Sequence, residues 1–375
     1  MIIIQQRYIP TLAGVRRVIA LARALSENGY SVRVIYLAAS ENLRCREDIP
    51  NVTFEYWGDS LYRKSQILGM ISSAWKLLFC LPKDIIYFYG MNPLIMLFLL
   101  LHNRKYLHEF TEYPGFIFGN SIVGKLKKWI HVMFMKKCQK VFVISKRLRG
   151  YCIENGIPKD RVGILNMFVD VSRFKDIERN SDEKYIGYCG NGENFKDGVD
   201  VLIKAFYLVA QKYNDVKLII AGRAPQKDWE SQQTLVSEYG LKERVKMLGK
   251  VSPDKIPSLL LNAEVLALAR PDNIQAAYGF PTKVGEYLAT GRPVVLTRVG
   301  ELEDFLENRK SCLFADPDSS EDFANNLCWL LDHPKEAALI GANGKKVAKE
   351  CFDNVHESEK VIDVLKTLSE KKMGK

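Results

Sequence analysis

Residues 267–295 read ALARPDNIQAAYGFPTKVGEYLATGRPVV and run from one apolar segment through a helical pattern to a second. The first apolar segment is Val265–Ala269, and the second is Val294–Thr297. Short apolar runs bounded by Gly, Pro or Asp are typical of strands that are buried on both faces of a parallel sheet. The stretch therefore predicts strand, helix and strand in an α/β fold.

The same alternation extends along the whole chain. Near the N-terminus, Ile2–Ile4 and Val32–Leu37 flank a helix whose apolar face is Val15, Val18, Ile19, Ala22 and Leu25. Further strands are expected at Ile85–Tyr89, Val141–Ile144, Tyr185–Cys189, Val216–Ala221, Val245–Leu248 and Cys312–Phe314. We expect two Rossmann-like, doubly wound domains that face each other across a cleft, with ligands beyond the carboxyl ends of the strands.

Length and charge suggest where the domains divide. The length of 375 residues suits two domains, and residues 1–165 hold 24 basic and 11 acidic side chains against 30 and 33 in the rest. A polar stretch, Lys175–Lys184, shows no apolar periodicity. We expect an N-terminal domain over 1–165, a linker over 166–184, a C-terminal domain over 185–345 and a helical segment over 346–375 that packs back across the domains.

Composition excludes several classes of protein. A chain with 47% hydrophobic and 26% charged residues is neither disordered nor a polytopic membrane protein. Eight cysteines without CxxC spacing are expected to be reduced, and we expect no metal and no cofactor. The N-terminus does not resemble a signal peptide, so we expect a cytoplasmic protein. No nucleic-acid-reading element is recognisable.

Charged residues in the opening stretch indicate an anion site. Arg270 directly follows a strand, and Gly279–Lys283 opens a helix with Pro281 suited to its first position. Unpaired N–H groups at a helix start attract anions, and a bound phosphate would relieve the unfavourable placement of Lys283 there. Glu286 could accept two hydroxyl hydrogen bonds from a ribose. The alternative is an exposed Lys283–Glu286 ion pair.

These residues resemble the nucleotide-sugar-binding domain of retaining GT-B glycosyltransferases of family 4, the group 1 glycosyl transferases. In that family a G-F-x-P-type loop precedes a helix with the second glutamate of an E-x7-E motif, which Glu286 matches. The resemblance covers nearly the whole chain. Other segments that match in the family's order are Ala13-Gly14, His108-Glu109 with Glu112-Tyr113-Pro114, Asn166–Asp170 with Phe174, Tyr188–Asn191, Lys196–Gly198, Tyr287–Ala289 and Gly291–Val295.

The resemblance implies roles for individual residues. His108 would lie in an acceptor-side loop and face the transferred sugar, with packing at a strand end as the alternative, and Glu112 would act as an acceptor-side base. Tyr278 stands in place of the first motif glutamate, Asn191 in place of a frequent arginine, and Ala13 in place of a glycine, which leaves the donor sugar open. The implied donor-binding residues are Gly14, Gly190, Asn191, Lys196, Arg270, Tyr278, Gly279, Phe280, Lys283 and Glu286.

The activity implied by the resemblance is transfer of a sugar from a UDP- or GDP-sugar to a glycan or lipid-linked acceptor, with retention, in surface polysaccharide or lipopolysaccharide assembly. Because Lys196, Arg270 and Lys283 could stabilise the departing diphosphate, we expect a metal-independent reaction. A nucleotide-sugar epimerase of the same fold and a non-catalytic binding protein are the alternatives. If Arg270 and Lys283 pointed away from the cleft, or were occupied by acidic partners within the protein, this mechanism would have no site.

A basic segment, Ile122–Lys140, is the candidate acceptor or membrane surface. Its apolar side chains share one helical stripe, namely Ile122, Leu126, Trp129, Ile130, Met133 and Phe134. A cationic helix with an aromatic stripe can bind an anionic membrane peripherally, here the inner face of the plasma membrane. The alternative is that the stripe is core. The lysines around it are Lys125, Lys127, Lys128, Lys136, Lys137 and Lys140.

Overall fold

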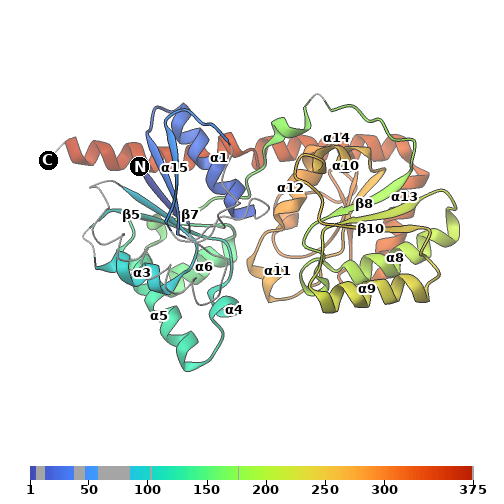
Figure 1. Cartoon of the computed structure of the whole chain (residues 1–375), viewed down its shortest axis with the longest axis horizontal. Coiled ribbons are helices and arrows are strands. Elements are labelled where there is room, and N and C mark those ends of the chain that lie inside the picture. The colour runs from blue at the N-terminus through green and yellow to red at the C-terminus, as the bar shows by residue number, and fades with distance from the viewer. Residues whose placement is uncertain (6–12, 38–46, 58–84, 102–103, 176, 374–375) are drawn as a thin grey trace. The chain divides into compact units, whose positions relative to one another are not determined.

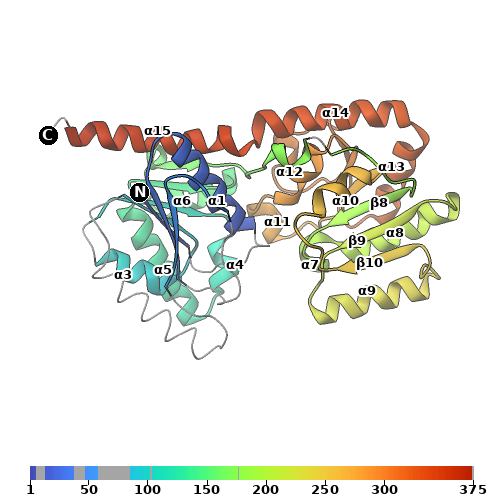
Figure 2. The same cartoon turned by 45° about the horizontal axis from the view of Figure 1, so that its top comes forward.

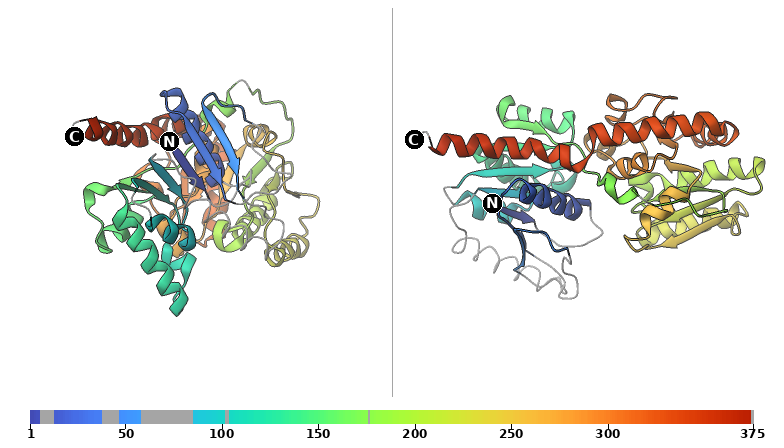
Figure 3. Two further views of the ribbon diagram at one scale, coloured as in Figure 1. Left: turned by 60° about the vertical axis from the view of Figure 1, so that its left-hand side comes forward. Right: turned by 90° about the horizontal axis from the view of Figure 1, so that it is seen from above.

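The computed structural model describes residues 1–5, 13–37, 47–57, 85–101, 104–175 and 177–373, which form two units (Figure 1). Unit 1 contains Met1–Phe168 and Asn354–Lys375, and unit 2 contains Val169–Asp353. Each unit is built on one sheet of parallel strands with helices on both faces, as Figures 2 and 3 show. The expectation of two Rossmann-like α/β folds is confirmed.

The sheet of unit 1 has the strand order β3-β2-β1-β4-β5-β6-β7. Its strands are β1 (Ile2–Gln5), β2 (Val32–Tyr36), β3 (Val52–Tyr56), β4 (Ile86–Tyr89), β5 (Tyr106–Phe110), β6 (Lys140–Val143) and β7 (Val162–Ile164). Its helices are α1 (Ala13–Glu27), α3 (Pro93–Leu100), α4 (Pro114–Phe118), α5 (Ile122–Lys137), α6 (Lys146–Glu154) and α15 (Asn354–Met373), with a 3₁₀ turn at Lys159–Arg161.

The sheet of unit 2 has the strand order β10-β9-β8-β11-β12-β13. Its strands are β8 (Tyr185–Cys189), β9 (Lys217–Ala221), β10 (Val245–Gly249), β11 (Val265–Leu268), β12 (Val294–Thr297) and β13 (Leu313–Ala315). Its helices are α7 (Asn194–Asp197), α8 (Val199–Lys212), α9 (Gln226–Glu238), α10 (Ile256–Asn262), α11 (Ile274–Tyr278), α12 (Thr282–Ala289), α13 (Ser320–Asp332) and α14 (Pro334–Cys351), with 3₁₀ turns η2 (Val171–Phe174) and η3 (Leu302–Asp304).

All ten strands expected from the sequence are present, each within one residue at either end, and the expected face of α1 is buried. Three further strands, β3, β5 and β7, were not expected. The pattern of apolar runs did not predict β5, because this strand carries His108 and Glu109, although all five of its residues are buried. β3 is an edge strand that is only partly buried, and β7 has three residues.

The helical segment near the C-terminus consists of two helices. α14 belongs to unit 2, and α15 belongs to unit 1, where it packs against α1 (Figure 1). Between them Asp353 pairs with Val169 in a parallel bridge, and the Val169 N–H donates to the Phe352 carbonyl at 2.9 Å. The two stretches of chain that connect the units therefore lie side by side.

Candidate functional site

The second sheet has a topological switch point between β8 and β11. These strands are neighbours, and strand order runs in opposite directions on either side of them. In open parallel sheets such a point is the usual ligand site, at the carboxyl ends of the strands. Gly190 and Asn191 directly follow β8, and Arg270 follows β11 by two residues. The topology thus brings three of the expected donor-binding residues to one sheet edge.

Two glycines allow the chain to close tightly at this edge. A Cβ on Gly190 would lie 2.4 Å from the Tyr188 hydroxyl oxygen and 2.5 Å from Cε of Lys283. Gly198 has φ +65°, and a Cβ there would lie 1.8 Å from the Ala269 carbonyl oxygen. The short helix α7 is therefore held against the end of β11, which places its last residues beside the switch point.

A buried ion pair lies at the centre of the site. Lys283 Nζ donates to Asp197 Oδ1 at 2.6 Å, with 14% of the lysine side chain exposed and none of the aspartate side chain. The Tyr188 hydroxyl donates to Asp197 Oδ2 at 2.5 Å and accepts from the Gly192 N–H at 2.9 Å. Both carboxylate oxygens of Asp197 are therefore engaged.

The pKa shifts in this network follow from burial and from the pair itself. Burial alone would raise the pKa of Asp197, but Lys283 and the Tyr188 hydroxyl reverse that effect, so the pKa is lowered. Burial lowers the pKa of Lys283, Asp197 opposes that, and the nearby charges of Lys196 and Arg270 lower it further. Burial raises the pKa of Tyr188 well above 10. The network thus consists of a carboxylate, an ammonium and a neutral phenol.

Asp197 is the internal acidic partner that would count against a phosphate-binding role for Lys283. An ammonium has three N–H donors, and Asp197 accepts one of them. Within the described residues, Lys283 has no other hydrogen-bond acceptor, so two donors remain for a ligand. Lys283 therefore has an acidic partner within the protein, which the sequence-based expectation set against the mechanism, but it keeps two donors that Asp197 does not use.

The start of α12 differs slightly from the expectation. Pro281 is the N-cap residue, and Thr282 is the first helical residue. Glu286, one turn further on, accepts from Arg173 NH1 at 2.7 Å, and Arg173 also donates to the Pro253 carbonyl at 3.1 Å. The exposed Lys283–Glu286 pair is therefore absent, because each residue pairs with a different counter-charge.

The remaining expected donor residues have varied surroundings. Arg270 is 4% exposed and donates to the Gln275 carbonyl at 3.0 Å. Phe280 is buried against Phe305 and Phe352, with ring centroids 5.5 and 5.6 Å away, so its visible role is packing. The other residues sit on the same edge: Tyr278 ends α11, Gly279 follows it, Lys196 is half-buried in α7 and Asn191 is exposed in the loop after β8.

Sequence reasoning missed three residues of this site, which are Tyr188, Asp197 and Arg173. Tyr188 and Asp197 lie in segments whose resemblance to the family was noted, but nothing in the sequence pairs Asp197 with a lysine 86 positions away. Arg173 lies in the expected linker and gives no local signal for its contact with Glu286. Such contacts depend on tertiary structure alone.

An acidic tripeptide with the Asp-x-Asp pattern, Asp316-Pro317-Asp318, lies away from this site. It follows β13, the edge strand of the sheet, and both aspartates are exposed. Asp318 has φ +60°, and Asp322 Oδ2 accepts from the Asp316 N–H at 2.8 Å. Among the residues with described positions, no group of three His, Cys, Asp or Glu side chains is arranged to hold a metal ion.

In unit 1, two expected site residues lie at a sheet edge. Gly14 is in the first turn of α1, where a Cβ would lie 2.7 Å from the ring of Tyr89 at the end of β4. Glu112 follows β5 and is half-buried. The strand order of this sheet reverses between β1 and β4, so Gly14 and Tyr89 mark its switch point.

His108 is placed differently from the expected acceptor-side loop. It lies inside β5, is fully buried and stacks between the rings of Phe88 and Phe110. Its Nε2 is 3.0 Å from Nε2 of His131 on α5, and its Nδ1 is 3.1 Å from the Phe88 carbonyl oxygen. The next residue, Glu109, points to the other face of the sheet, because side chains alternate along a strand.

The two histidines have defined tautomers. The Phe88 carbonyl can only accept, so His108 Nδ1 carries the proton and His108 Nε2 accepts from His131 Nε2–H. His131 Nδ1 then carries a lone pair, and it is buried without a partner among the residues described. Burial lowers the pKa of His108 to about 4 and lowers that of His131 well below 6.5.

Glu109 accepts from Arg17 and from the Tyr87 hydroxyl on the face covered by α1. Arg17 also donates to the Leu165 carbonyl at 2.9 Å, and its guanidinium lies 4.2 Å from the ring centre of Phe168. These contacts hold the last segment of unit 1 before the chain enters unit 2. Glu109 is therefore a buried structural carboxylate.

The helix α5 exposes much of its apolar stripe. Ile122 is 87% exposed, Leu126 55% and Trp129 59%, while Phe134 is buried. Lys125, Lys127 and Lys136 are exposed beside them, Lys128 donates to the Asn120 side chain, and Lys137 donates to the Leu100 carbonyl. The expectation that this stripe forms core therefore holds only for its C-terminal end.

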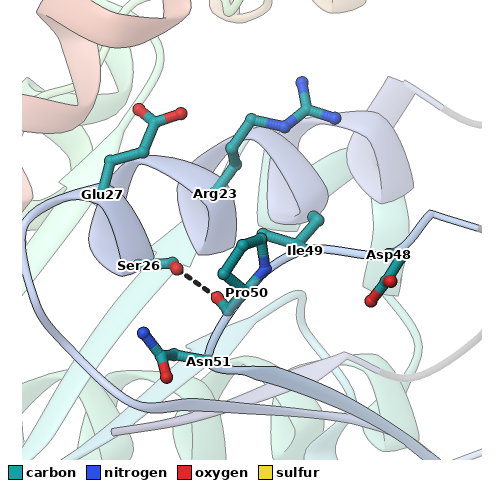
Figure 4. Close-up of a pocket in the computed structure, with 7 residues that line it drawn as sticks. All are labelled: Arg23, Ser26, Glu27, Asp48, Ile49, Pro50 and Asn51. Atoms are coloured by element: carbon teal, nitrogen blue, oxygen red, sulfur yellow. Dashed lines mark hydrogen bonds between the residues drawn. The ribbon is translucent and has the colours of Figure 1, made fainter.

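A small hollow of about 360 Å³ lies between the end of α1 and the segment before β3 (Figure 4). The Ser26 hydroxyl donates to the Pro50 carbonyl across it. Arg23 is its one cation, against the carboxylates of Glu27 and Asp48. This lining does not suit a diphosphate. None of the helices in the described parts of the chain combines the length and apolar character needed to span a membrane.

Each unit matches a glycosyltransferase family model. Residues 14–173 match the family model described as Glycosyltransferase Family 4, and residues 183–333 match the one described as Glycosyl transferases group 1. An uncharacterized glycosyltransferase of Methanocaldococcus jannaschii is 24% identical over 65% of this chain and 64% of its own length. The chain therefore spans slightly less than two thirds of that relative.

Solved structures show the same fold. Sucrose-phosphate synthase of Thermosynechococcus elongatus has a TM-score of 0.79 at 16% identity, covering 99% of both chains. HepE of Anabaena, in complex with UDP-glucose, has a TM-score of 0.74 at 18% identity, covering 98% of this chain and 99% of its own.

Proposed function

The chain belongs to the GT-B glycosyltransferases, and from that premise we propose that it transfers a sugar from a nucleotide diphosphate sugar to a glycan or lipid-linked acceptor. The observation that carries the proposal is the cluster of Lys196, Arg270 and Lys283 at the switch point of the second sheet. Negative charge accumulates on the diphosphate as the glycosidic bond breaks, and cations held in place stabilise it.

The same cluster supports a reaction that needs no divalent metal, because three cationic side chains supply the positive charge. We propose that Glu286 binds the ribose hydroxyls and that Glu112 is the acceptor-side base. Retention of configuration and a role in surface polysaccharide or lipopolysaccharide assembly follow from the family resemblance. The donor in the proposal is a UDP- or GDP-sugar, and the UDP-glucose complex of HepE favours testing the uridine nucleotide first.

The acceptor side of the proposal includes the surface of α5. Exposed apolar side chains beside exposed lysines suit an anionic membrane interface, where each nearby lysine adds about 1 kcal/mol to binding. We propose that Lys125, Lys127, Lys128, Lys136 and Lys137, with Trp129, contact the membrane that holds a lipid-linked acceptor. The location in this proposal is the inner face of the plasma membrane.

Thermal-shift measurements with UDP-glucose, GDP-mannose and the free nucleotides test donor binding, because a ligand at 100 times its Kd stabilises a protein by about 2.7 kcal/mol. We expect one nucleotide series to raise the unfolding temperature, and no shift with any of them contradicts the proposal. Turnover with a lipid-linked acceptor should persist in EDTA. Donor isomerisation without acceptor indicates an epimerase, and binding without turnover indicates a non-catalytic protein.

A further inference from the structure

A buried carboxylate is unexpected in a site for a doubly charged anion. Asp197 lies with Lys283 among the residues proposed to hold the donor diphosphate, and its side chain is fully buried. A carboxylate there repels phosphate and loses its own hydration, so it needs a compensating role. The arrangement of its two oxygens indicates what that role is.

The carboxylate of Asp197 is held rigidly on one side and holds a lysine on the other. Oδ2 accepts from the Tyr188 hydroxyl at 2.5 Å, and that hydroxyl oxygen accepts from the Gly192 N–H in the loop after β8. The backbone at Asp197 is fixed because Gly198 packs against the Ala269 carbonyl. Oδ1 therefore fixes Lys283 Nζ, at the end of a flexible four-carbon stem, at 2.6 Å.

We propose that Asp197 is a positioning residue that keeps the Lys283 ammonium charged and fixes it where its two remaining N–H donors meet the donor diphosphate. This inference rests on the proposed donor-binding function. Asp197 touches no substrate in this scheme and acts only through Lys283.

The charged groups around Lys283 explain why a counter-ion is needed. Lys196 on α7 and Arg270 after β11 are both cations, and burial acts in the same direction as their repulsion. Tyr188 on β8 and Tyr287 on α12 are phenols whose pKa values burial raises well above 10, and Glu286 on α12 is paired with Arg173. Asp197 is thus the carboxylate whose contact opposes proton loss from Lys283.

Replacing Asp197 by asparagine keeps the shape and removes the charge. Lys283 would then be a buried amine beside two cations, and buried lysines without a counter-charge can have pKa values of about 5 to 6. Affinity for UDP-glucose should consequently fall as pH rises. The diphosphate of UDP-glucose keeps its charge between pH 6.0 and 8.5, so wild-type affinity should stay nearly constant there as long as Asp197 keeps Lys283 charged.

The experiment measures Kd for UDP-glucose by calorimetry between pH 6.0 and 8.5. We expect Asp197→Asn to bind UDP-glucose at least about tenfold more weakly than the wild type at pH 8.5, where its lysine is neutral and the charge-assisted hydrogen bond is lost, and the difference to shrink towards pH 6.0. The double variant Asp197→Asn/Lys283→Arg should restore a flat profile, since arginine stays protonated. Asp215→Asn is the matched control, because Asp215 pairs with Lys184 in an exposed lysine–aspartate pair.

An Asp197→Asn profile parallel to that of the wild type overturns the inference, whatever the change in unfolding temperature. If Asp197→Asn does not fold, Lys283→Met replaces it. If Asp197 acts only through Lys283, Asp197→Asn/Lys283→Met should bind UDP-glucose no more weakly than Lys283→Met, and a further loss of affinity in the double variant overturns the inference. Failure of the wild type to bind any nucleotide sugar contradicts the proposed function instead, which separates the two outcomes.

Discussion

Removing the buried histidine pair of unit 1 should make this unit more resistant to acid. In the double variant His108→Phe/His131→Phe, two aromatic rings replace the imidazoles between Phe88, Phe110 and Phe134. Replacing both partners of a buried hydrogen bond by apolar groups of similar shape is often nearly neutral at a pH where neither carries charge. The effect should therefore appear only as the pH falls.

The magnitude follows from the pKa of His108, which burial lowers from 6.5 to about 4. At pH 5.0 the unfolded chain binds a proton at this imidazole that the folded chain does not bind, so folding loses stability as the pH falls from 7.5. Linkage gives a loss of about 2 kcal/mol from His108 alone. The pKa of His131 is also lowered, so its contribution has the same sign.

Hydrogen–deuterium exchange of β5 amides in graded urea measures the free energy of unfolding of this unit. The difference between pH 7.5 and pH 5.0 should be larger in the wild type than in the double variant by at least about 2 kcal/mol. His356→Gln is the control, because His356 is 60% exposed, and it should behave as the wild type. Equal pH dependence in wild type and double variant would refute the assignment of two neutral buried imidazoles.

Three further predictions concern the donor site, the fold and the membrane surface. Glu286→Gln should weaken binding of UDP roughly 10-fold, because a hydrogen bond to a charged group is lost, and should leave binding of inorganic pyrophosphate unchanged. Equal losses of affinity for both ligands in calorimetry would contradict a ribose contact. Gly198→Ala should destabilise unit 2 by more than about 3 kcal/mol, because φ is +65° and the new Cβ would lie 1.8 Å from the Ala269 carbonyl oxygen. An unchanged midpoint of urea unfolding would be inconsistent with this geometry. Leu126→Ser/Trp129→Ser should reduce co-sedimentation with vesicles of anionic phospholipid at least tenfold, because Leu126 and Trp129 are each more than half exposed. The control is Leu339→Ser, on the exposed face of α14, which should leave co-sedimentation unchanged.

The sequence predicted the parts of the fold that follow from local pattern. Continuous apolar runs such as Val265–Ala269 correspond to strands buried on both faces, and periodicity at Val15 and Leu25 gave the buried face of α1. β5 was missed because His108 and Glu109 look polar in sequence, yet each is buried with a tertiary partner. A rule based on hydrophobicity cannot recognise a strand whose polar residues are satisfied by distant groups.

For the candidate site, local pattern predicted which residues lie at the ends of strands but not which side chains pair with each other. Arg270 and Gly190 follow from their positions after strands, because parallel strands end at the same edge of a sheet. The counter-charges of Lys283 and Glu286, which are Asp197 and Arg173, lie 86 and 113 residues away in the sequence. No local pattern connects residues so far apart, so their pairing needed the tertiary structure.

In the proposed function, the cations at the switch point of the second sheet hold the diphosphate of a sugar nucleotide. Calorimetry on four proteins tests this role: the wild type, Arg270→Met, Lys283→Met and the exposed-lysine control Lys227→Met. The affinities to compare are those for UDP-glucose and for the nucleotide sugar that gives the largest thermal shift. We expect a loss of about 10- to 100-fold for Arg270→Met and for Lys283→Met, which is the value of one charge-assisted hydrogen bond, and no loss for the control. Wild-type affinity in both site variants would contradict it.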